Sequence, residues 1–247
     1  MFQALTAFYL YSQFHKNLFS FLKRCQFKNL ASDVSKNLPK DGKILEIGFG
    51  NGELLLALKE KGFKNVYGSD FTDDNFGHLK NKEIVLKASN IEETFPFDEK
   101  FDGIIMNNVI EHFLNPLKVL NSCKNNLAEN GIIVLITPNS DALEFPIFKK
   151  YWAGFHAPRH LFIFNKKNIK TLGMKLGFSE ISIKSATDPG QWSISVQNIL
   201  QDKNLTKAKL TNGMAWYLIP LSMIFSPISI LQNVAGNSTS MIVFLKR

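Results

Sequence analysis

A chain of 247 residues is long enough to bury the core of one α/β domain, and no linker, repeat or low-complexity tract divides it. Its two cysteines, Cys25 and Cys123, lie far apart and form no C-x-x-C, which argues against a disulfide framework and a structural zinc site. The formal net charge of +8 favours an acidic ligand or a negatively charged membrane surface, whereas the scattered basic residues lack the aromatic alternation of a nucleic-acid platform.

The N-terminal segment is unusually aromatic. Residues 1–27 contain eight Phe and Tyr side chains among polar residues, with a basic pair at Lys23 and Arg24. We expect residues 1–39 to form a helical cap over the open edge of a binding site; an amphipathic helix at a lipid surface is the alternative. The first fifteen residues contain no Lys or Arg and no uninterrupted apolar core, so no secretory signal is predicted and a cytoplasmic location is expected.

A buried strand, a glycine-rich turn and a helix follow one another from Ile44 to Gly62. Ile44, Leu45 and Ile47 form a short apolar run that Glu46 interrupts, and leucines then recur at helical spacing. Glycines at 48, 50 and 52 allow positive φ and a close approach to a ligand. A dinucleotide fingerprint requires a further glycine where Glu53 stands, so the pattern disfavours NAD.

The next predicted strand, residues 66–70, ends in a second acid. Asp70 lies 18 residues after Gly52, where a carboxylate can accept hydrogen bonds from both hydroxyls of a ribose. This acid alone suits NAD and S-adenosylmethionine equally. A further strand is predicted at Phe101-Asp102-Gly103-Ile104-Ile105.

E-x-G-x-G-x-G, Gly68-Ser69-Asp70 and the strand at 101–105 together resemble the class I S-adenosylmethionine-dependent methyltransferases, over roughly residues 40–185. In that family the glycine turn passes under the methionine part of the cofactor, the acid after the second strand holds the ribose, and a residue after the third strand contacts the adenine. The resemblance therefore implies S-adenosylmethionine as cofactor and a set of binding residues, namely Glu46, Gly48, Phe49, Gly50, Asn51, Gly52, Asp70, Phe71, Asn90, Ile91, Asn107 and Val109. Many relatives have Asp where this chain has Asn90, whose side-chain carbonyl can accept the same hydrogen bond.

The remaining elements continue the alternation of strand and helix. Leu117, Leu120, Lys124 and Leu127 predict one helix face, Ile132 to Ile136 a buried strand, and Ile169 to Leu176 a helix that ends at Gly177. Strands are expected at residues 178–185 and 241–245. This order predicts an α/β fold with a doubly wound, mostly parallel sheet and helices on both faces. The resemblance adds that the sheet is Rossmann-like and seven-stranded, with an antiparallel last strand beside the sixth.

Two segments could supply residues that act on the acceptor. Glu111 and His112 resemble the family's exit from the fourth strand; alternatively they only cap the next helix. No metal site is predicted, although this pair could contribute to one in a related enzyme.

The segment from Tyr151 to Phe162 follows the predicted fifth strand, at the sheet edge where such folds bind ligands. Its Trp followed by Pro-x-His-Leu-x-x-Phe resembles a methyltransferase subgroup that acts on quinone precursors and on cell-envelope sugars or lipids. We expect His160 as catalytic base, with His156 second, and Arg159 and Trp152 as substrate-binding residues. The alternatives are that His160 only bonds backbone and that Trp152 belongs to the core.

The C-terminal region is apolar, since no charged residue occurs between Lys209 and Lys246. We divide the chain into the cap at 1–39, a cofactor-binding core at 40–185, an apolar lid or insert at 186–238 and the last strand at 239–247. Residues 214–231 are long enough to suggest a transmembrane span, but Pro220, Pro227 and the missing basic flanks argue against one. A buried lid is favoured over monotopic contact with a membrane or lipid-like substrate.

The predicted function is methyl transfer from S-adenosylmethionine to a small-molecule or lipid- or glycan-linked acceptor, with oxygen as the favoured position of methylation; the net charge is compatible with an anionic acceptor. Such a reaction requires an acceptor in line with the methyl group in a pocket that excludes water. The alternatives are an NAD-linked oxidoreductase and a non-catalytic module that keeps the cofactor fold. Binding of nucleic acid is not expected, and peripheral contact with the inner membrane face remains open.

Overall fold

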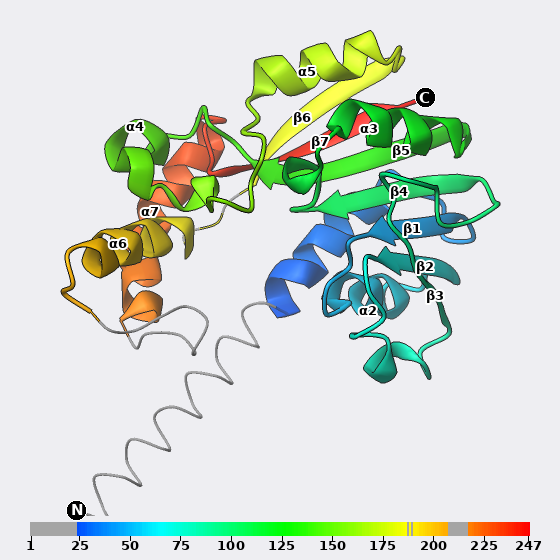
Figure 1. The fold of residues 1–247 in the computed structure, drawn as a ribbon, viewed down its shortest axis with the longest axis horizontal. Helices are drawn as coiled ribbons and strands as arrows, with labels where there is room; N and C mark the ends of the chain where they lie inside the picture. Colours follow the sequence, from blue (N-terminus) through cyan, green and yellow to red (C-terminus); the bar gives the residue numbers. More distant parts are fainter. Residues whose placement is uncertain (1–23, 187, 189, 207–216) are drawn as a thin grey trace, which may run out of the picture.

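The computed structural model describes residues 24–186, 188, 190–206 and 217–247. Within these residues, seven strands form one central sheet in the order β3-β2-β1-β4-β5-β7-β6 (Figure 1). The strands are β1 (Lys43–Ile47), β2 (Asn65–Asp70), β3 (Ile84–Ala88), β4 (Phe101–Asn107), β5 (Leu127–Pro138), β6 (Glu180–Ala186) and β7 (Ser240–Lys246).

The pairing of the strands confirms the predicted fold class. β1 pairs in parallel with β2 and β4, β2 with β3, and β4 with β5. The last strand, β7, runs antiparallel between β5 and β6. The carboxyl ends of β1, β2 and β4 therefore meet at one edge of the sheet, which is where parallel α/β sheets bind ligands.

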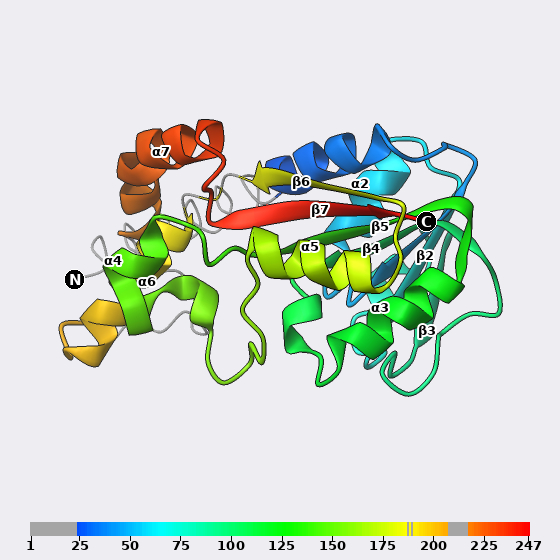
Figure 2. The ribbon, with the colours of Figure 1, turned by 90° about the horizontal axis from the view of Figure 1, so that it is seen from above.

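Helices cover both faces of the sheet (Figure 2). Helix α2 (Glu53–Glu60) and the helical residues 24–35 lie on one face, where Ala31 and Val34 share a core cluster with the leucines of α2. Helices α3 (Pro116–Asn125) and α5 (Lys166–Lys175) lie on the other. The described part of the predicted cap thus packs beside α2 against the sheet, and residues 1–23 lie outside the described residues.

One predicted boundary is wrong. Helix α3 ends at Asn125, and Leu127 begins β5 opposite Phe101 instead of completing the helix face. The register between β4 and β5 shifts between Phe101 and Gly103, so an irregular start lengthens β5 beyond the predicted run at 132–136. Leu127 is fully buried in β5, and because a buried leucine also fits a helix face, helical spacing alone could not separate the two.

A group of helices and 3₁₀ turns stands beyond the carboxyl ends of the parallel strands (Figure 1). This helical unit comprises α4 (Glu144–Phe148), the 3₁₀ turns η3 (Lys149–Tyr151) and η4 (Ala153–Phe155), α6 (Gly190–Asp202) and α7 (Leu218–Val234). It has its own aromatic core around Phe148, Trp152 and Trp192. The predicted apolar insert at 186–238 forms α6 and α7, and within the described ranges no helix is long and apolar enough to cross a membrane.

Candidate functional site

The glycine turn between β1 and α2 has the backbone that the sequence predicts. Gly48, Gly50 and Gly52 have φ values of 69°, 54° and 73°, a region that side-chain-bearing residues seldom adopt. A Cβ atom on Gly48 would lie 2.6 Å from Cγ2 of Val109, whereas one on Gly50 would meet nothing within 4 Å. Gly50 therefore faces open space, so its backbone is the part of the turn that a ligand can approach.

Asp70 ends β2 beside this turn. Its Oδ2 accepts a hydrogen bond from the amide of Gly50 at 2.8 Å, and its Oδ1 accepts one from the amide of Phe71 at 2.7 Å. The carboxylate is thus fixed against the turn and keeps further lone pairs for other donors. The next side chain, Phe71, is 73% exposed, so an aromatic surface lies next to this acid.

Glu46 is a buried acid directly before the turn. Burial raises its pKa well above the usual value, and the nearby carboxylates of Glu53 and Asp70 add to the rise. Its Oε2 has no hydrogen-bond partner among the described residues. A buried, unpaired carboxyl oxygen is costly, and a donor or a positive charge on a ligand would relieve that cost.

The other residues predicted to bind the cofactor differ in how their side chains lie. The ring of Phe49 packs in the core with its centroid 5.5 Å from that of Phe76, so only its backbone lies at the turn. The Asn51 carbonyl oxygen lies 2.7 Å from Nε2 of His78.

The residues after β3 and β4 also frame the edge. Asn90 donates a hydrogen bond from Nδ2 to Glu93 and accepts one at Oδ1 from the amide of Glu92. Its side-chain amide is therefore already bonded to residues of the loop in which it lies. Ile91 is buried in the main core. Asn107 ends β4 half-buried, and Val109 fills the space above Gly48.

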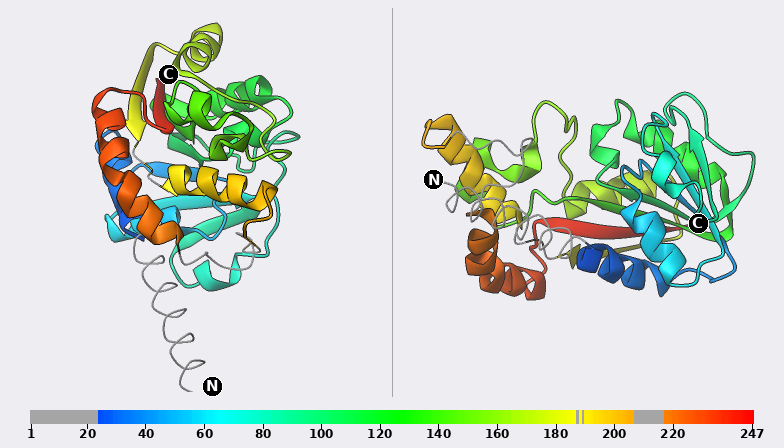
Figure 3. Two further views of the ribbon diagram at one scale, coloured as in Figure 1. Left: turned by 90° about the vertical axis from the view of Figure 1, so that its left-hand side faces the viewer. Right: turned by 90° about the horizontal axis from the view of Figure 1, so that it is seen from below.

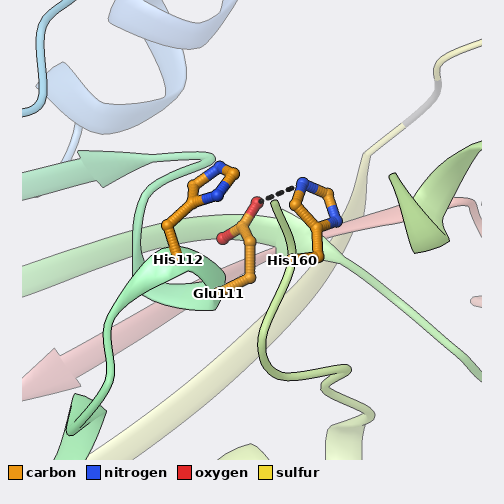
Figure 4. A group of neighbouring side chains, drawn as sticks. All are labelled: Glu111, His112 and His160. Carbon is orange, nitrogen blue, oxygen red and sulfur yellow. Dashed lines mark ion pairs between the residues drawn. The ribbon is translucent and has the colours of Figure 1, made fainter. Parts of the chain in front are cut away.

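Glu111, His112 and His160 form a cluster at the same edge (Figure 4). Glu111 and His112 come from the 3₁₀ turn after β4 (Ile110–His112), and His160 comes from the loop between η4 and α5. Nε2 of His160 lies 3.8 Å from Oε1 of Glu111, whose other oxygen accepts a hydrogen bond from the hydroxyl of Thr137 at 3.0 Å. The two histidine rings meet edge to face, with centroids 4.8 Å apart.

Backbone carbonyls fix the orientation of both histidines. Nδ1 of His112 lies 2.9 Å from the carbonyl oxygen of Arg159, and Nδ1 of His160 lies 2.7 Å from that of Gly154. A carbonyl only accepts, so each Nδ1 carries hydrogen and each neutral ring keeps a lone pair on Nε2. The alternative that His160 bonds backbone is therefore confirmed as a contact, and it leaves Nε2 available as a base.

The electrostatics of this cluster are those of groups withdrawn from water. Burial raises the pKa of Glu111 to about 7, and its Oε1 has no hydrogen-bond partner among the described residues. Burial lowers the pKa of His160, which favours the neutral ring. A neutral imidazole beside a carboxyl that titrates near neutrality is suited to moving a proton.

The ligand atoms of Glu111, His112 and His160 lie within 4.8 Å of one another, so within the described ranges this group could hold a metal ion. Two imidazoles and a carboxylate are ligands that zinc accepts. A shared proton between Glu111 and His160 would satisfy the same lone pairs. The sequence predicts no metal, and the geometry leaves both alternatives open.

The other acceptor-side residues divide into exposed and buried ones. His156 and Arg159 are exposed on the same loop, and the His156 ring lies 5.2 Å from that of His160. Burial and the charge of Arg159 lower the pKa of His156. The prediction that Trp152 contacts substrate does not fit the structure, because its indole is 1% exposed and packs against Phe145 and Phe155. It supports the loop from beneath.

Sequence reasoning missed two groups that hold the cluster. Thr137 at the end of β5 could have been found, because residues at strand carboxyl ends face ligands in such sheets. The carbonyl of Gly154, which orients His160, has no sequence signal. A Cβ on Gly154 would collide with the Trp152 ring, so this glycine lets the loop pass over the indole.

Comparisons with known proteins agree with this architecture. The profile of a family described as "Methyltransferase domain" matches residues 15–183. A curated relative, the ubiquinone biosynthesis O-methyltransferase of Dinoroseobacter shibae, is 30% identical over 117 residues, which are 45% of this chain and 47% of the relative. The chain thus spans about half the length of such curated relatives.

Solved structures share the fold at low identity. A SAM-dependent methyltransferase from Archaeoglobus fulgidus is 18% identical with a TM-score of 0.60, over 91% of this chain and 94% of that one. A phosphoethanolamine N-methyltransferase of Haemonchus contortus, in complex with phosphomonomethylethanolamine and S-adenosylhomocysteine, is 19% identical with a TM-score of 0.57, over 88% and 52%. The chain therefore belongs to the methyltransferase-domain family, which confirms the resemblance to class I S-adenosylmethionine-dependent methyltransferases.

Proposed function

We propose that this protein transfers a methyl group from S-adenosylmethionine to an acceptor held at the edge of the sheet. The observation that carries the proposal is the set of groups around the glycine turn: the open backbone at Gly50, the carboxylate of Asp70 and the buried carboxyl of Glu46, whose Oε2 has no partner among the described residues. S-adenosylmethionine offers a ribose diol to the first acid and positive charge to the second. Family membership agrees with this assignment.

Within this proposal, the residues along the cofactor side of the edge have separate roles. Asp70 accepts hydrogen bonds from the ribose, Gly48 to Gly52 lie under the methionine portion, and Asn90 with Ile91 borders the adenine. The exposed ring of Phe71 covers the adenosine from the solvent side. Val109 packs against Gly48 at the turn, and Asn107 ends the neighbouring strand β4.

The proposed acceptor is a small molecule or a lipid- or glycan-linked compound that is methylated at oxygen. His160 removes the hydroxyl proton through Nε2, and His156 is the second candidate for that step. Arg159 is exposed and supplies a positive charge for an anionic group on the acceptor. The O-methyltransferase relative supports the choice of oxygen. We further propose that the protein works in the cytoplasm, in contact with the inner face of the membrane.

Two other functions are less well supported. An NAD-linked oxidoreductase conflicts with Glu53 in place of the third glycine and with family membership. A non-catalytic module that binds the cofactor would keep the turn and Asp70 but would have no need of the fixed His160 and its buried carboxyl neighbour.

The test of the cofactor assignment is calorimetric titration of the full chain with S-adenosylmethionine, with NADH in a parallel cell. Asp70→Ala should weaken the binding of S-adenosylmethionine by about 1.5 to 3 kcal/mol, the contribution of a hydrogen bond to a charged group. Asp70→Asn keeps an acceptor for the Gly50 amide and separates the loss of charge from a disturbed turn. Asp73→Ala, an exposed acid on the same loop, is the matched control and should bind as the wild type does.

A further inference from the structure

Helix α7 buries Leu218 and Ile219 at its start, but from residue 222 onward its polarity is largely reversed relative to a helix of a water-soluble domain. Its inward face carries the side chains of Ser222, Ser226, Ser229 and Gln232, which are buried or half-buried. Its outward face carries large apolar side chains, of which Met223, Ile224, Ile230, Leu231 and Val234 are between 58% and 83% exposed. A helix in water normally turns its apolar side inward.

Hydrogen bonds to α4 and α6 fix this rotation of the helix. Gln232 accepts from Nε1 of Trp192 at 2.9 Å and donates to the carboxylate of Glu144 at 2.6 Å. The hydroxyls of Ser193 and Ser222 lie 2.8 Å apart. Turning the apolar face inward would break these bonds and leave buried polar groups unpaired, which is unfavourable.

The exposed residues form one continuous surface. Met223, Pro227, Leu231 and Val234 follow each other at helical spacing, and Ile224, Ile228 and Ile230 extend the surface on either side. Figure 3, left, views the molecule from this end, with α7 (orange to red) and α6 (yellow) in front of the sheet. Contiguous apolar surface of this kind marks an interaction site, whereas scattered apolar residues do not.

The chemistry of α7 and its surroundings favours a lipid bilayer as the partner. No charged residue occurs between Leu210 and Leu245, so nothing opposes entry into the acyl boundary. The chain carries a formal net charge of +8, which complements anionic headgroups. A 17-residue helix is about 25 Å long, shorter than the roughly 30 Å hydrocarbon core, and its polar face is held by the protein.

We propose that α7 docks the protein on an anionic bilayer by lying in the interface plane, with its outward apolar face in the acyl boundary. This inference extends the proposed membrane contact to a defined surface, and vesicle binding does not depend on methyl transfer.

The docking surface is connected to the candidate site. Trp192 of α6 stacks on Phe225 of α7, with ring centroids 5.0 Å apart. Two residues of α6 bind the turns η3 and η4, which lead to the His160 loop. Ser195 accepts a hydrogen bond from the amide of Ala153 at 2.9 Å, and Asn198 donates one to the carbonyl of Tyr151 at 3.0 Å. The same loop continues to the carbonyl that orients His160. Docking through α7 therefore brings the His160 loop to the membrane, where a lipid-linked acceptor would be found.

The test is flotation of the full chain with vesicles of phosphatidylcholine containing phosphatidylglycerol. The triple variant Met223→Gln, Leu231→Gln, Val234→Thr removes apolar side chains that are already exposed. We expect its vesicle partitioning to fall at least about tenfold. The matched control, Val85→Thr, Leu114→Gln, Met174→Gln, changes the same residue types at exposed positions of the sheet domain and should float as the wild type does.

Three results would overturn the proposal. The first is a wild-type chain that stays in the soluble fraction, and the second is a triple variant that floats as well as the wild type does. The third is a concentration-dependent dimer that the triple variant disrupts and the control variant does not, because this result would assign the face to a second copy of the chain. Titration with S-adenosylmethionine is run on the same samples. A wild-type chain that binds S-adenosylmethionine but not vesicles would contradict the docking proposal alone. One that binds vesicles but not S-adenosylmethionine would contradict the proposed function alone.

Discussion

Helix α2 covers one face of the sheet and helix α7 belongs to the helical unit, and the two differ in the side chains that they bury. Helix α2 buries Leu54, Leu55 and Leu58 against the sheet, while α7 buries Ser229 and Gln232 and exposes Met223 and Leu231. The sheet domain is stabilised by apolar burial, as a body in water must be. The helical unit combines a small aromatic core with polar contacts of α7, and these polar contacts keep one apolar face of α7 free. The sheet therefore supplies the proposed cofactor site, and the helical unit determines which surface faces the acceptor.

The largest effect is expected where the two regions meet. His160→Ala removes the proposed base, and its turnover should fall roughly 10²- to 10⁴-fold while the affinity for S-adenosylmethionine stays near that of the wild type. The reason is that cofactor binding belongs to the sheet edge and proton removal to the loop of the helical unit. Single-turnover rates and calorimetry measure the two quantities separately. Undiminished turnover would remove His160 from the chemistry.

The opposite polarity of the two helices predicts opposite sensitivity to truncation. Leu58→Ala should destabilise the protein by roughly 2 to 5 kcal/mol, because Leu58 is fully buried and its truncation leaves a cavity. Leu231→Ala, the same change on α7, should shift the free energy of unfolding by less than about 0.5 kcal/mol in the absence of lipid. Urea unfolding of both variants measures the contrast. Similar losses for both would mean that Leu231 is covered in solution.

The pH dependence of stability tests the environment of Glu111. Its pKa of about 7 in the folded protein exceeds the ordinary value of 4.5, so between these values the folded state holds the extra proton. Stability from this group is therefore complete below about pH 4.5 and is lost as pH rises through about 7, by roughly 3 kcal/mol in all. Glu111→Gln should be less affected by this rise. Unfolding free energies of both proteins at about pH 5 and about pH 8 give the difference, and equal slopes would contradict the burial of this carboxyl.

The sheet domain could be predicted because its signals are local. The glycine turn, Asp70 and the alternation of strand and helix lie in short windows of sequence, and the structure joins them as expected. Leu127 is the exception, because a buried leucine fits a helix face and a strand equally well.

The acceptor side depends on contacts that no short window contains. Glu111 and His160 are 49 positions apart, and the carbonyl that orients His160 belongs to a glycine. The polar face of α7 did have a signal, since Ser222, Ser226, Ser229 and Gln232 recur at helical spacing. Sequence reasoning weighed a transmembrane span, a buried lid and membrane contact for this segment and did not use that spacing.

The most direct test of the central claim is the binding of S-adenosylmethionine by the purified full chain, measured by calorimetry beside Asp70→Ala. The account predicts micromolar binding by the wild type, a loss of about 1.5 to 3 kcal/mol in the variant and no binding of NADH. A folded protein that binds no S-adenosylmethionine, or that binds NADH in its place, would contradict the assignment of the glycine turn and Asp70 to this cofactor.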